Sequence, residues 1–392
     1  MYKRQPVYDA TIVKKLREAG ADFVCKASMD ELGMGGTNKN AYTGAVHNPY
    51  DLDRIPGGSS GGCAALVAAG CVPLAIGTDT GDSVRKPAAY CGVVGVKPTY
   101  GRISRYGIIP YASSLDHVGY FTTNVKDAAL ALEVLAGRDD HDMTSSYEEV
   151  KEYSKLLNGD LTNKTIGVFK TVMDEVKNEE LKAQFNTLVS KLEEKGAKIV
   201  EVEMPKEYME LIAPVYKTIA NAEATANHSN LDGIRFGMRE EGQDLEEVMT
   251  NTRTKGFSSY VRARFVIGSY SLFEENQDRL FRKAQKIRRL IVQAYAKMFE
   301  ECDAVLSVAA PTIAPLINES TNVRFGVSSF AEEHMQLQNF SGYPSITLPL
   351  GKVDSMPVAV NLTCKPFEEQ KMFDVSSAIE ECTGLKGQCL EG

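Results

Sequence analysis

Two serines in a glycine-rich stretch have the residue types and surroundings for nucleophilic chemistry. Ser59 lies in the run GGSSGG at residues 57–62, and Ser83 lies in GDSVR at residues 81–85. Dense glycines let backbone N–H groups converge, because glycine adopts positive φ and permits close approach of the backbone. A nest of this kind can bind a phosphate, or it can stabilise an oxyanion beside a nucleophile.

The acyl-transfer interpretation of this stretch is favoured over phosphate binding. Residues 56–102 contain neither GxxxxGK[ST] nor GxGxxG at the required offsets. The apolar run at residues 73–77 predicts a strand, and Ser83 follows it in a loop that can present a hydroxyl at the sheet edge. The alternative left open by the residues alone is that GGSSGG is only a flexible loop.

Composition excludes several other classes of protein. The 392 residues are 43% hydrophobic and 24% charged, which is typical of a globular chain with a sizeable core. The net charge of −8 gives no general reason to bind a polyphosphate directly. The eight cysteines form no CxxC pair and the five histidines lack metal-ligand spacing, so we expect no metal site and a reducing, cytoplasmic location. No apolar run reaches the roughly 20 residues that span a bilayer, so no membrane association is expected.

Helices and strands alternate along the chain, which predicts an α/β fold. Residues 8–19 predict a helix that runs into a strand at 23–25. Residues 165–169 and 198–202 predict two strands. The helix between them carries apolar residues at spacings of three and four, namely Leu181, Phe185, Leu188 and Leu192, and ends at Gly196. This βαβ arrangement indicates parallel strand pairs covered by helices.

A helical insert divides the predicted strands into two groups. Residues 206–300 are mostly helix-forming and highly charged. After the insert, strands are predicted at 304–308, 345–350 and 357–362, and a final helix at 368–382. The simplest architecture is one sheet interrupted by this insert, with the polar residues 137–140 forming an exposed loop between its two halves.

The segment around the two serines resembles the amidase signature family. The resemblance rests on GGSSGG followed by GTDTGDSVRKPAAYCGVVGVKPTYGR at residues 77–102. It implies a single amidase-signature domain over residues 1–392, with a central mixed sheet flanked by helices. It also implies that Ser83 is the nucleophile and that Ser59 is a relay serine on a cis peptide bond. The oxyanion hole would be formed by backbone N–H groups of Thr80, Gly81, Asp82 and Ser83.

Two further segments resemble the subfamily of A subunits of glutamyl-tRNA(Gln) amidotransferases. They are YGRISRYGIIPYASSLDHVG at residues 100–119 and YDATIVKKLREAGADFVCKASMDELGMGG at residues 8–36. The resemblance implies that the chain hydrolyses glutamine through an acyl-enzyme and supplies ammonia to a B subunit, with a small C subunit completing the complex. Glu-tRNA(Gln) would be bound mainly by the B subunit. ATP and magnesium would also act there, so no cofactor is expected in this chain.

Binding of free glutamine requires partners for its α-carboxylate and α-ammonium groups once water is excluded. By the same resemblance, Arg264 in VRARFVIGSYSL matches a carboxylate-binding arginine. Glu332 in FAEEHMQLQNFSGYP falls where the subfamily has an aspartate for the amino group. The alternative for both residues is an ordinary surface charge.

The chain departs from the family pattern beside the nucleophile. Asp82 replaces the second glycine of the family's GGS element, which places a carboxylate beside the expected oxyanion hole. We expect its side chain to point away from the hole, with Arg85 or Lys86 as its partner.

A second departure concerns the catalytic base. The family's neutral lysine base lies in a segment that precedes the helix at residue 8, and none of Lys14, Lys15, Lys26 and Lys97 matches it. We therefore expect an N-terminally truncated chain that is inactive alone, since general-base assistance is typically worth about 10²–10⁴-fold. Two alternatives are a stand-alone amidase for another small amide and a non-catalytic interaction homologue.

Overall fold

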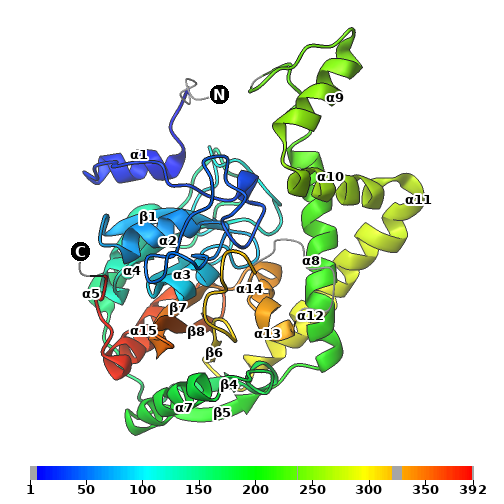
Figure 1. Ribbon diagram of the computed structural model, residues 1–392. Coiled ribbons are helices and arrows are strands. Elements are labelled where there is room, and N and C mark those ends of the chain that lie inside the picture. The colour runs from blue at the N-terminus through cyan, green and yellow to red at the C-terminus, as the bar shows by residue number, and fades with distance from the viewer. Residues whose placement is uncertain (1–6, 236, 320–328, 391–392) are drawn as a thin grey trace.

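One eight-stranded mixed sheet forms the centre of the molecule (Figure 1). The computed structural model describes residues 7–235, 237–319 and 329–390. The strand order is β1-β3-β2-β7-β8-β6-β4-β5. The strands are β1 (Leu74–Asp79), β2 (Val94–Lys97), β3 (His117–Thr122), β4 (Thr165–Phe169), β5 (Lys198–Val202), β6 (Ala304–Val308), β7 (Ser345–Val353) and β8 (Met356–Cys364).

The sheet combines antiparallel and parallel pairs. β4 pairs in parallel with both β5 and β6, whereas the pairs on the β1 side are antiparallel. The central strands β6 and β8 are buried at every position, as expected for strands covered on both faces. The edge strand β1 alternates between half-buried and buried residues. The α/β class with a mixed central sheet is therefore confirmed.

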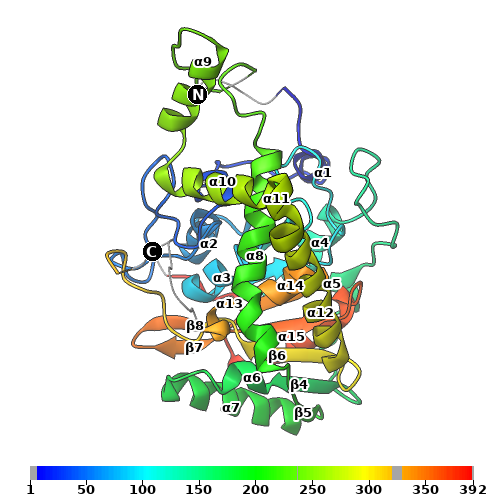
Figure 2. The same cartoon turned by 90° about the vertical axis from the view of Figure 1, so that its right-hand side faces the viewer.

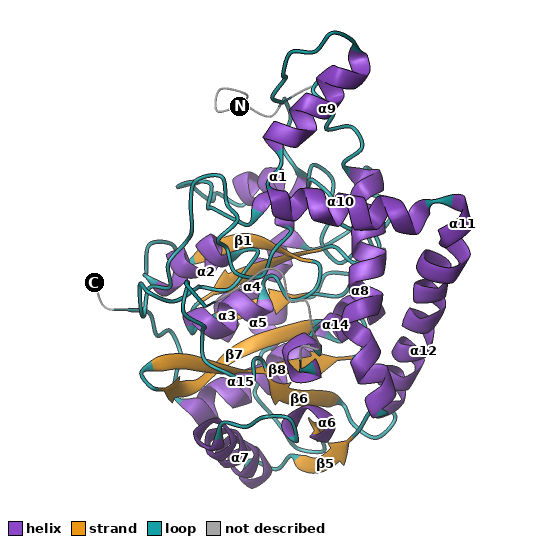
Figure 3. Cartoon of the chain, turned by 45° about the vertical axis from the view of Figure 1, so that its right-hand side comes forward, coloured by secondary structure: helices purple, strands orange, loops and turns teal. Residues whose placement is uncertain are grey.

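Helices cover both faces of the sheet (Figure 3). One layer packs α2 (Gly61–Ala68) on β1 and β3, and α3 (Arg85–Cys91) on β2, β7 and β8. The other layer includes α4 (Val125–Leu135), α7 (Glu179–Glu194) and α15 (Glu369–Thr383), and α15 contacts both of its layer partners. Five short or peripheral helices complete this part: α1 (Thr11–Glu18), α5 (Tyr153–Leu156), α6 (Lys170–Met173), α13 (Phe330–Glu333) and α14 (Gln336–Ser341).

The helices between β5 and β6 form one side of the molecule (Figure 2). They are α8 (Lys206–Asn227), α9 (Leu245–Gly256), α10 (Ser259–Leu272), α11 (Glu274–Gln277) and α12 (Lys283–Met298), and a π-helical turn joins the last two. α8 packs against both α10 and α12, while α9 projects away from the sheet (Figure 1). Ser258 caps α10 by accepting a hydrogen bond from the N–H of Val261, which fixes where this helix begins.

The strands predicted at 165–169, 198–202 and 304–308 are present with those bounds, and the helix containing Leu181 and Leu192 lies between the first two. The strand predicted at 23–25 was wrong. These residues are exposed, belong to no described strand and pair with none of the eight described strands. An apolar run that finds no strand partner cannot satisfy its backbone groups as a strand.

The loop at 137–140 is less exposed than its polarity suggested. The side chain of Asp139 is buried and accepts hydrogen bonds from the hydroxyls of Thr11 and Ser104. The loop thus ties α1 to the segment after β2. Among the described residues, no helix is long and apolar enough to cross a membrane.

Gly268 sets the close approach of α10 to α8. A Cβ at this position would collide with the carbonyl oxygen of Asn221 and with the hydroxyl of Thr225, both on α8. We predict that Gly268→Ala lowers the free energy of unfolding by about 1–3 kcal/mol, because the two helices must separate.

Gly256→Ala at the end of α9 is the matched control for urea unfolding. A Cβ there meets only the sulfur of Met238 at 3.7 Å, so the change should stay within about 0.5 kcal/mol. Equal effects of the two substitutions would show that the contact between α8 and α10 is not tight.

Candidate active site

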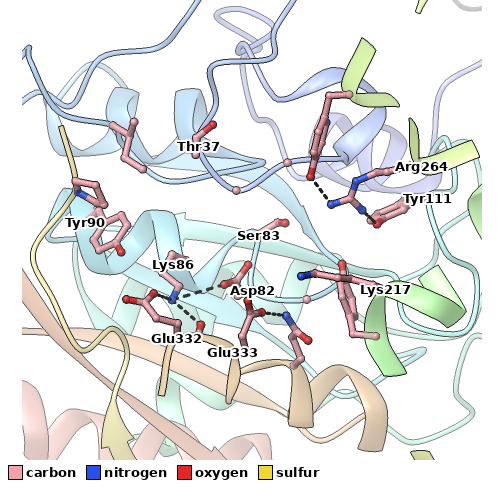
Figure 4. A pocket seen from close by; sticks show the side chains of 18 of the residues that line it. Thr37, Asp82, Ser83, Lys86, Tyr90, Tyr111, Lys217, Arg264, Glu332 and Glu333 are labelled. Carbon is pink, nitrogen blue, oxygen red and sulfur yellow. Dashed lines mark hydrogen bonds and ion pairs between the residues drawn. The ribbon is translucent and has the colours of Figure 1, made fainter. Parts of the chain in front are cut away.

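A cavity of about 220 Å³ lies where the loop after β1 meets the helical side of the molecule (Figure 4). Its wall is made by residues 35–37, by residues 81–83 with the first turn of α3, and by side chains from α8, α10 and α13. Elements that are far apart in the sequence therefore converge on one enclosure. Of the seven predicted site residues, Gly81, Asp82, Ser83, Arg264 and Glu332 line it.

Ser83 lies in the loop between β1 and α3. Its side chain is buried at the cavity wall. Among the described residues, no backbone hydrogen bond engages the N–H groups of Gly81, Asp82 or Ser83. A Cβ on Gly81 would approach the ring of Tyr216 to 3.0 Å, so the glycine allows α8 to close over this loop. Three consecutive unpaired donors beside a serine can stabilise an oxyanion.

A buried ion pair beneath the loop fixes its shape. Asp79 at the end of β1 and Arg85 at the start of α3 lie 2.9 Å apart with both side chains fully buried. The carboxylate also accepts from the N–H of Val84 at 3.0 Å, and the guanidinium donates to the carbonyl of Gly81 at 2.8 Å. Burial opposes ionisation of Asp79, but the charge of Arg85 outweighs it and holds the pKa of Asp79 well below its usual range. The residues between the two charges are thereby held in one loop conformation.

Ser59 belongs to the segment that is hydrogen-bonded to Ser83. The N–H of Ser60 donates to the carbonyl of Ser83 at 3.1 Å, which joins the two serine motifs. The Gly58–Ser59 peptide bond is cis, as the family resemblance implied. The Ser59 hydroxyl is buried and has no hydrogen-bond partner among the described residues. No described lysine therefore bonds to it; Lys97, for example, donates to the carbonyl of Tyr343 at 2.6 Å.

Asp30 organises the loop that packs on Ser59. Its buried carboxylate accepts from the N–H groups of Asn38 and Asn40 at 2.9 and 3.0 Å, and its own N–H donates to the carbonyl of Ser59. Burial is the main reason that the pKa of Asp30 rises to about 6, although these hydrogen bonds oppose the shift. A Cβ on Gly58 would collide with this carboxylate, so the GGSSGG run needs glycine there.

Arg264 lies at the opposite end of the cavity from α13. Its guanidinium donates to the hydroxyls of Tyr111 and Tyr260 and, at 3.4 Å, to the side-chain oxygen of Asn221. The guanidinium also lies 4.8 Å from the ring centroid of Tyr260. All of these partners are neutral, and no carboxylate of the described residues pairs with Arg264. An enclosed cation held by neutral groups is suited to bind an anionic ligand.

Three ionisable side chains form a cluster at the α13 end of the cavity (Figure 4). The ammonium of Lys86 donates to the carbonyl of Glu332 at 2.9 Å and to its carboxylate at 3.3 Å, and lies 3.8 Å from the carboxylate of Asp82. Burial raises the pKa of Asp82 to about 7, against the opposing charge of Lys86. Burial also disfavours the charged form of Lys86, but its acidic neighbours outweigh this and raise its pKa.

Asp82 pairs with Lys86, one of the two partners expected from the sequence. Its side chain lines the cavity, because Lys86, one turn later on α3, holds it there. Arg85, the other candidate partner, is occupied by Asp79. Thr80 is buried behind the wall, where its hydroxyl donates to Asp116 at 2.7 Å.

Sequence reasoning missed several cavity residues. Lys217 on α8 extends into the cavity and has no hydrogen-bond or ion-pair partner among the described residues (Figure 4). Tyr216 and Tyr260 also line it. The one available signal was the i, i+4 spacing of Tyr260 and Arg264 on a predicted helix, which places both on the same face. The described residues contain no cluster of three or more His, Cys, Asp or Glu suited to a metal ion.

Comparison with known proteins identifies the class. A model of the family described as Amidase matches residues 2–373, and the chain belongs to this family. The chain is 42% identical to the A subunit of glutamyl-tRNA(Gln) amidotransferase from Fusobacterium nucleatum, over 96% of its own length and 77% of that protein. It is 40% identical to the protein of the same name from Lactobacillus acidophilus, over 97% of its own length and 79% of that protein.

Solved structures agree with this placement. The crystal structure of the A subunit of glutamyl-tRNA(Gln) amidotransferase from Thermotoga maritima superposes with a TM-score of 0.79 at 35% identity, covering 97% of this chain and 77% of that one. The peptide amidase of Stenotrophomonas maltophilia gives a TM-score of 0.78 at 27% identity, covering 96% and 77%. The amidase-signature fold expected from the sequence motifs is therefore confirmed.

The Asp79–Arg85 pair gives a direct test of how the loop that carries Ser83 is held. We predict that Arg85→Met lowers the free energy of unfolding by about 3–5 kcal/mol, because it leaves Asp79 buried without a counter-charge. The same substitution at Arg282, which forms an exposed pair with Asp278 on the helical side, should cost less than about 1 kcal/mol. A loss at Arg85 no larger than that at Arg282, measured by urea unfolding, would contradict this role.

Proposed function

We propose that the chain is the glutamine-hydrolysing subunit of a tRNA-dependent amidotransferase and that Ser83 is its nucleophile. The observation that carries the proposal is the position of Ser83 in the cavity, between the enclosed cation of Arg264 and the acidic cluster at α13. The names of the relatives and the similarity to the Thermotoga maritima structure support it.

The geometry is suited to a two-step acyl transfer. In the first step the Ser83 hydroxyl oxygen forms a bond to the amide carbon, and its proton passes to a base. The carbonyl oxygen becomes an oxyanion within reach of the N–H groups of Gly81, Asp82 and Ser83. Collapse of this intermediate breaks the C–N bond, and the returning proton allows ammonia to leave. Water then hydrolyses the ester and releases glutamate and free Ser83.

Ser59 is proposed as the proton relay between Ser83 and the base. Its buried hydroxyl has no partner among the described residues, so it can both accept and donate during the reaction. The resemblance to amidase signature proteins implies a neutral lysine as the base. No described lysine reaches Ser59. We therefore expect acylation of Ser83 by the described residues alone to be about 10²–10⁴-fold slower than in a site that has its base.

Glutamine would lie across the cavity with its amide at Ser83. Arg264 would bind the α-carboxylate, because its present partners are neutral and can share the guanidinium. Glu332 would accept a hydrogen bond from the α-ammonium, although it already binds Lys86. This orientation directs the scissile carbonyl toward the unpaired N–H groups of the β1–α3 loop.

The proposed partners follow from the same assignment. A B subunit would receive the ammonia and carry ATP, magnesium and Glu-tRNA(Gln), and a C subunit would complete the complex in the cytoplasm.

A stand-alone amidase is the second candidate function. It is favoured by the pairing of Glu332 with Lys86, because an amide without an α-ammonium would not need that carboxylate.

The test is ammonia release from glutamine by the chain co-expressed with its B and C subunits. Whatever glutamine-dependent rate the unmodified chain shows, Ser83→Ala should reduce it to the rate without protein, because the covalent step is lost. Ser113→Ala, an exposed serine outside the cavity lining, should stay within about twofold of the unmodified chain.

Glutamine-dependent ammonia release that survives Ser83→Ala would remove Ser83 as the nucleophile. Hydrolysis of a simple amide without the partner subunits, with no effect of glutamine, would favour the stand-alone amidase.

A further inference from the structure

Lys86 occupies the position where the proposed substrate would place its ammonium group. We propose that Lys86 is an internal competitor for this group, so that the cavity binds an ω-amide bearing a carboxylate but no α-ammonium more tightly than it binds glutamine. The inference rests on the proposed function, since it concerns the same cavity and the same Arg264 end.

The contacts of Lys86 resemble those that a bound ammonium would make. Its ammonium has three N–H donors, and three oxygens surround it: the carbonyl and carboxylate of Glu332 at 2.9 and 3.3 Å and the carboxylate of Asp82 at 3.8 Å. Its side chain is only 7% exposed, while those of Asp82 and Glu332 are 22% and 15% exposed. The acidic end of the cavity is therefore already filled by a cation of the protein.

An incoming α-ammonium would have to share or displace this cation. Displacement removes the nearer carboxylate from the buried ammonium of Lys86 and leaves that of Asp82 at 3.8 Å, which is unfavourable for a cation with little access to water. Sharing places two ammonium groups on one carboxylate, where they repel each other. In both cases, part of the favourable free energy of binding the substrate ammonium is lost.

Two further acids, Glu319 and Glu333, also line the cavity. Glu333, beside Glu332, accepts a hydrogen bond from Gln336. The other end is clearly cationic, because Arg264 has only neutral partners and Lys217 extends into the same space (Figure 4). Lys86 thus pairs with Glu332, the carboxylate proposed for the substrate ammonium, while Arg264 has only neutral partners; this arrangement favours a ligand that has a carboxylate but no ammonium.

The experiment compares glutamine with glutaramate, the same ω-amide with hydrogen in place of the α-ammonium, by calorimetric titration. Binding is measured without turnover, so the readout does not depend on the catalytic base. The unmodified chain should bind glutaramate about tenfold more tightly, since a charge-assisted hydrogen bond is worth about that factor. Lys86→Gln, which frees Glu332, should raise the affinity for glutamine about tenfold and change that for glutaramate less than about threefold.

Lys255→Gln is the matched control, because it removes a lysine that pairs with Glu240 on the surface at α9. It should change neither affinity. If Lys86→Gln does not fold, the ratio of the affinities of the unmodified chain for the two ligands still tests the role of Lys86.

The outcomes separate the two proposals. If the unmodified chain binds glutamine as tightly as glutaramate or more tightly, the role of Lys86 is overturned while the proposed function stands. If glutamine binding is then lost in Glu333→Gln, the substrate ammonium is assigned to Glu333. An equal shift of both ligands in Lys86→Gln would also overturn it. Binding of neither ligand to the unmodified chain would remove the proposed function, and this inference with it.

Discussion

The buried pair of Asp79 and Arg85 is the interaction on which the site depends. It closes the loop between β1 and α3 by joining its two ends, and Ser83 and the unpaired N–H groups lie between them. Arg85 also donates to the side-chain oxygens of Gln338 and Asn339 on α14, at 2.8 and 2.7 Å. The same guanidinium therefore sets the nucleophile loop and docks it against the helix that follows the acidic cluster.

This arrangement explains why residues distant in the sequence form one cavity. The sheet supplies the fixed end of β1, while α8 and α10 approach from the helical side and bring Lys217 and Arg264. The close contact of α8 with α10 fixes the distance between the cationic end and Ser83. The cavity thus has opposite electrostatic ends, and Lys86 determines how much negative charge the acidic end presents.

Much of the fold could be predicted from the sequence because its local patterns are strong. The strand at 165–169 and the helix that begins at Glu179 have clear periodicity and clear ends, and the structure keeps both. The strand predicted at 23–25 failed because a strand requires a pairing partner, and short apolar runs contain no information about partners. Long-range contacts were likewise inaccessible: the pairing of Lys86 with Glu332 joins residues 246 positions apart.

At the site, sequence motifs indicated Ser59, Ser83, Arg264 and Glu332, of which the last three line the cavity, but they could not give the orientation of side chains. For Asp82 the sequence offered both Arg85 and Lys86 as partners, and only the structure shows that the partner is Lys86. Lys217 and Tyr216 belong to no motif, and only the packing of α8 brings them to the cavity.

The central claim is that Ser83 is aimed at the carbonyl of a bound ω-amide. Its most direct test is covalent trapping with a phosphonofluoridate analogue of glutamine, in which the serine oxygen bonds to phosphorus and displaces fluoride, followed by mass spectrometry of the proteolysed chain. The account predicts one adduct on Ser83, reduced by competing glutaramate and absent in Ser83→Ala. An adduct on another side chain, such as the thiol of Cys63, or the absence of any adduct at saturating analogue, would contradict it.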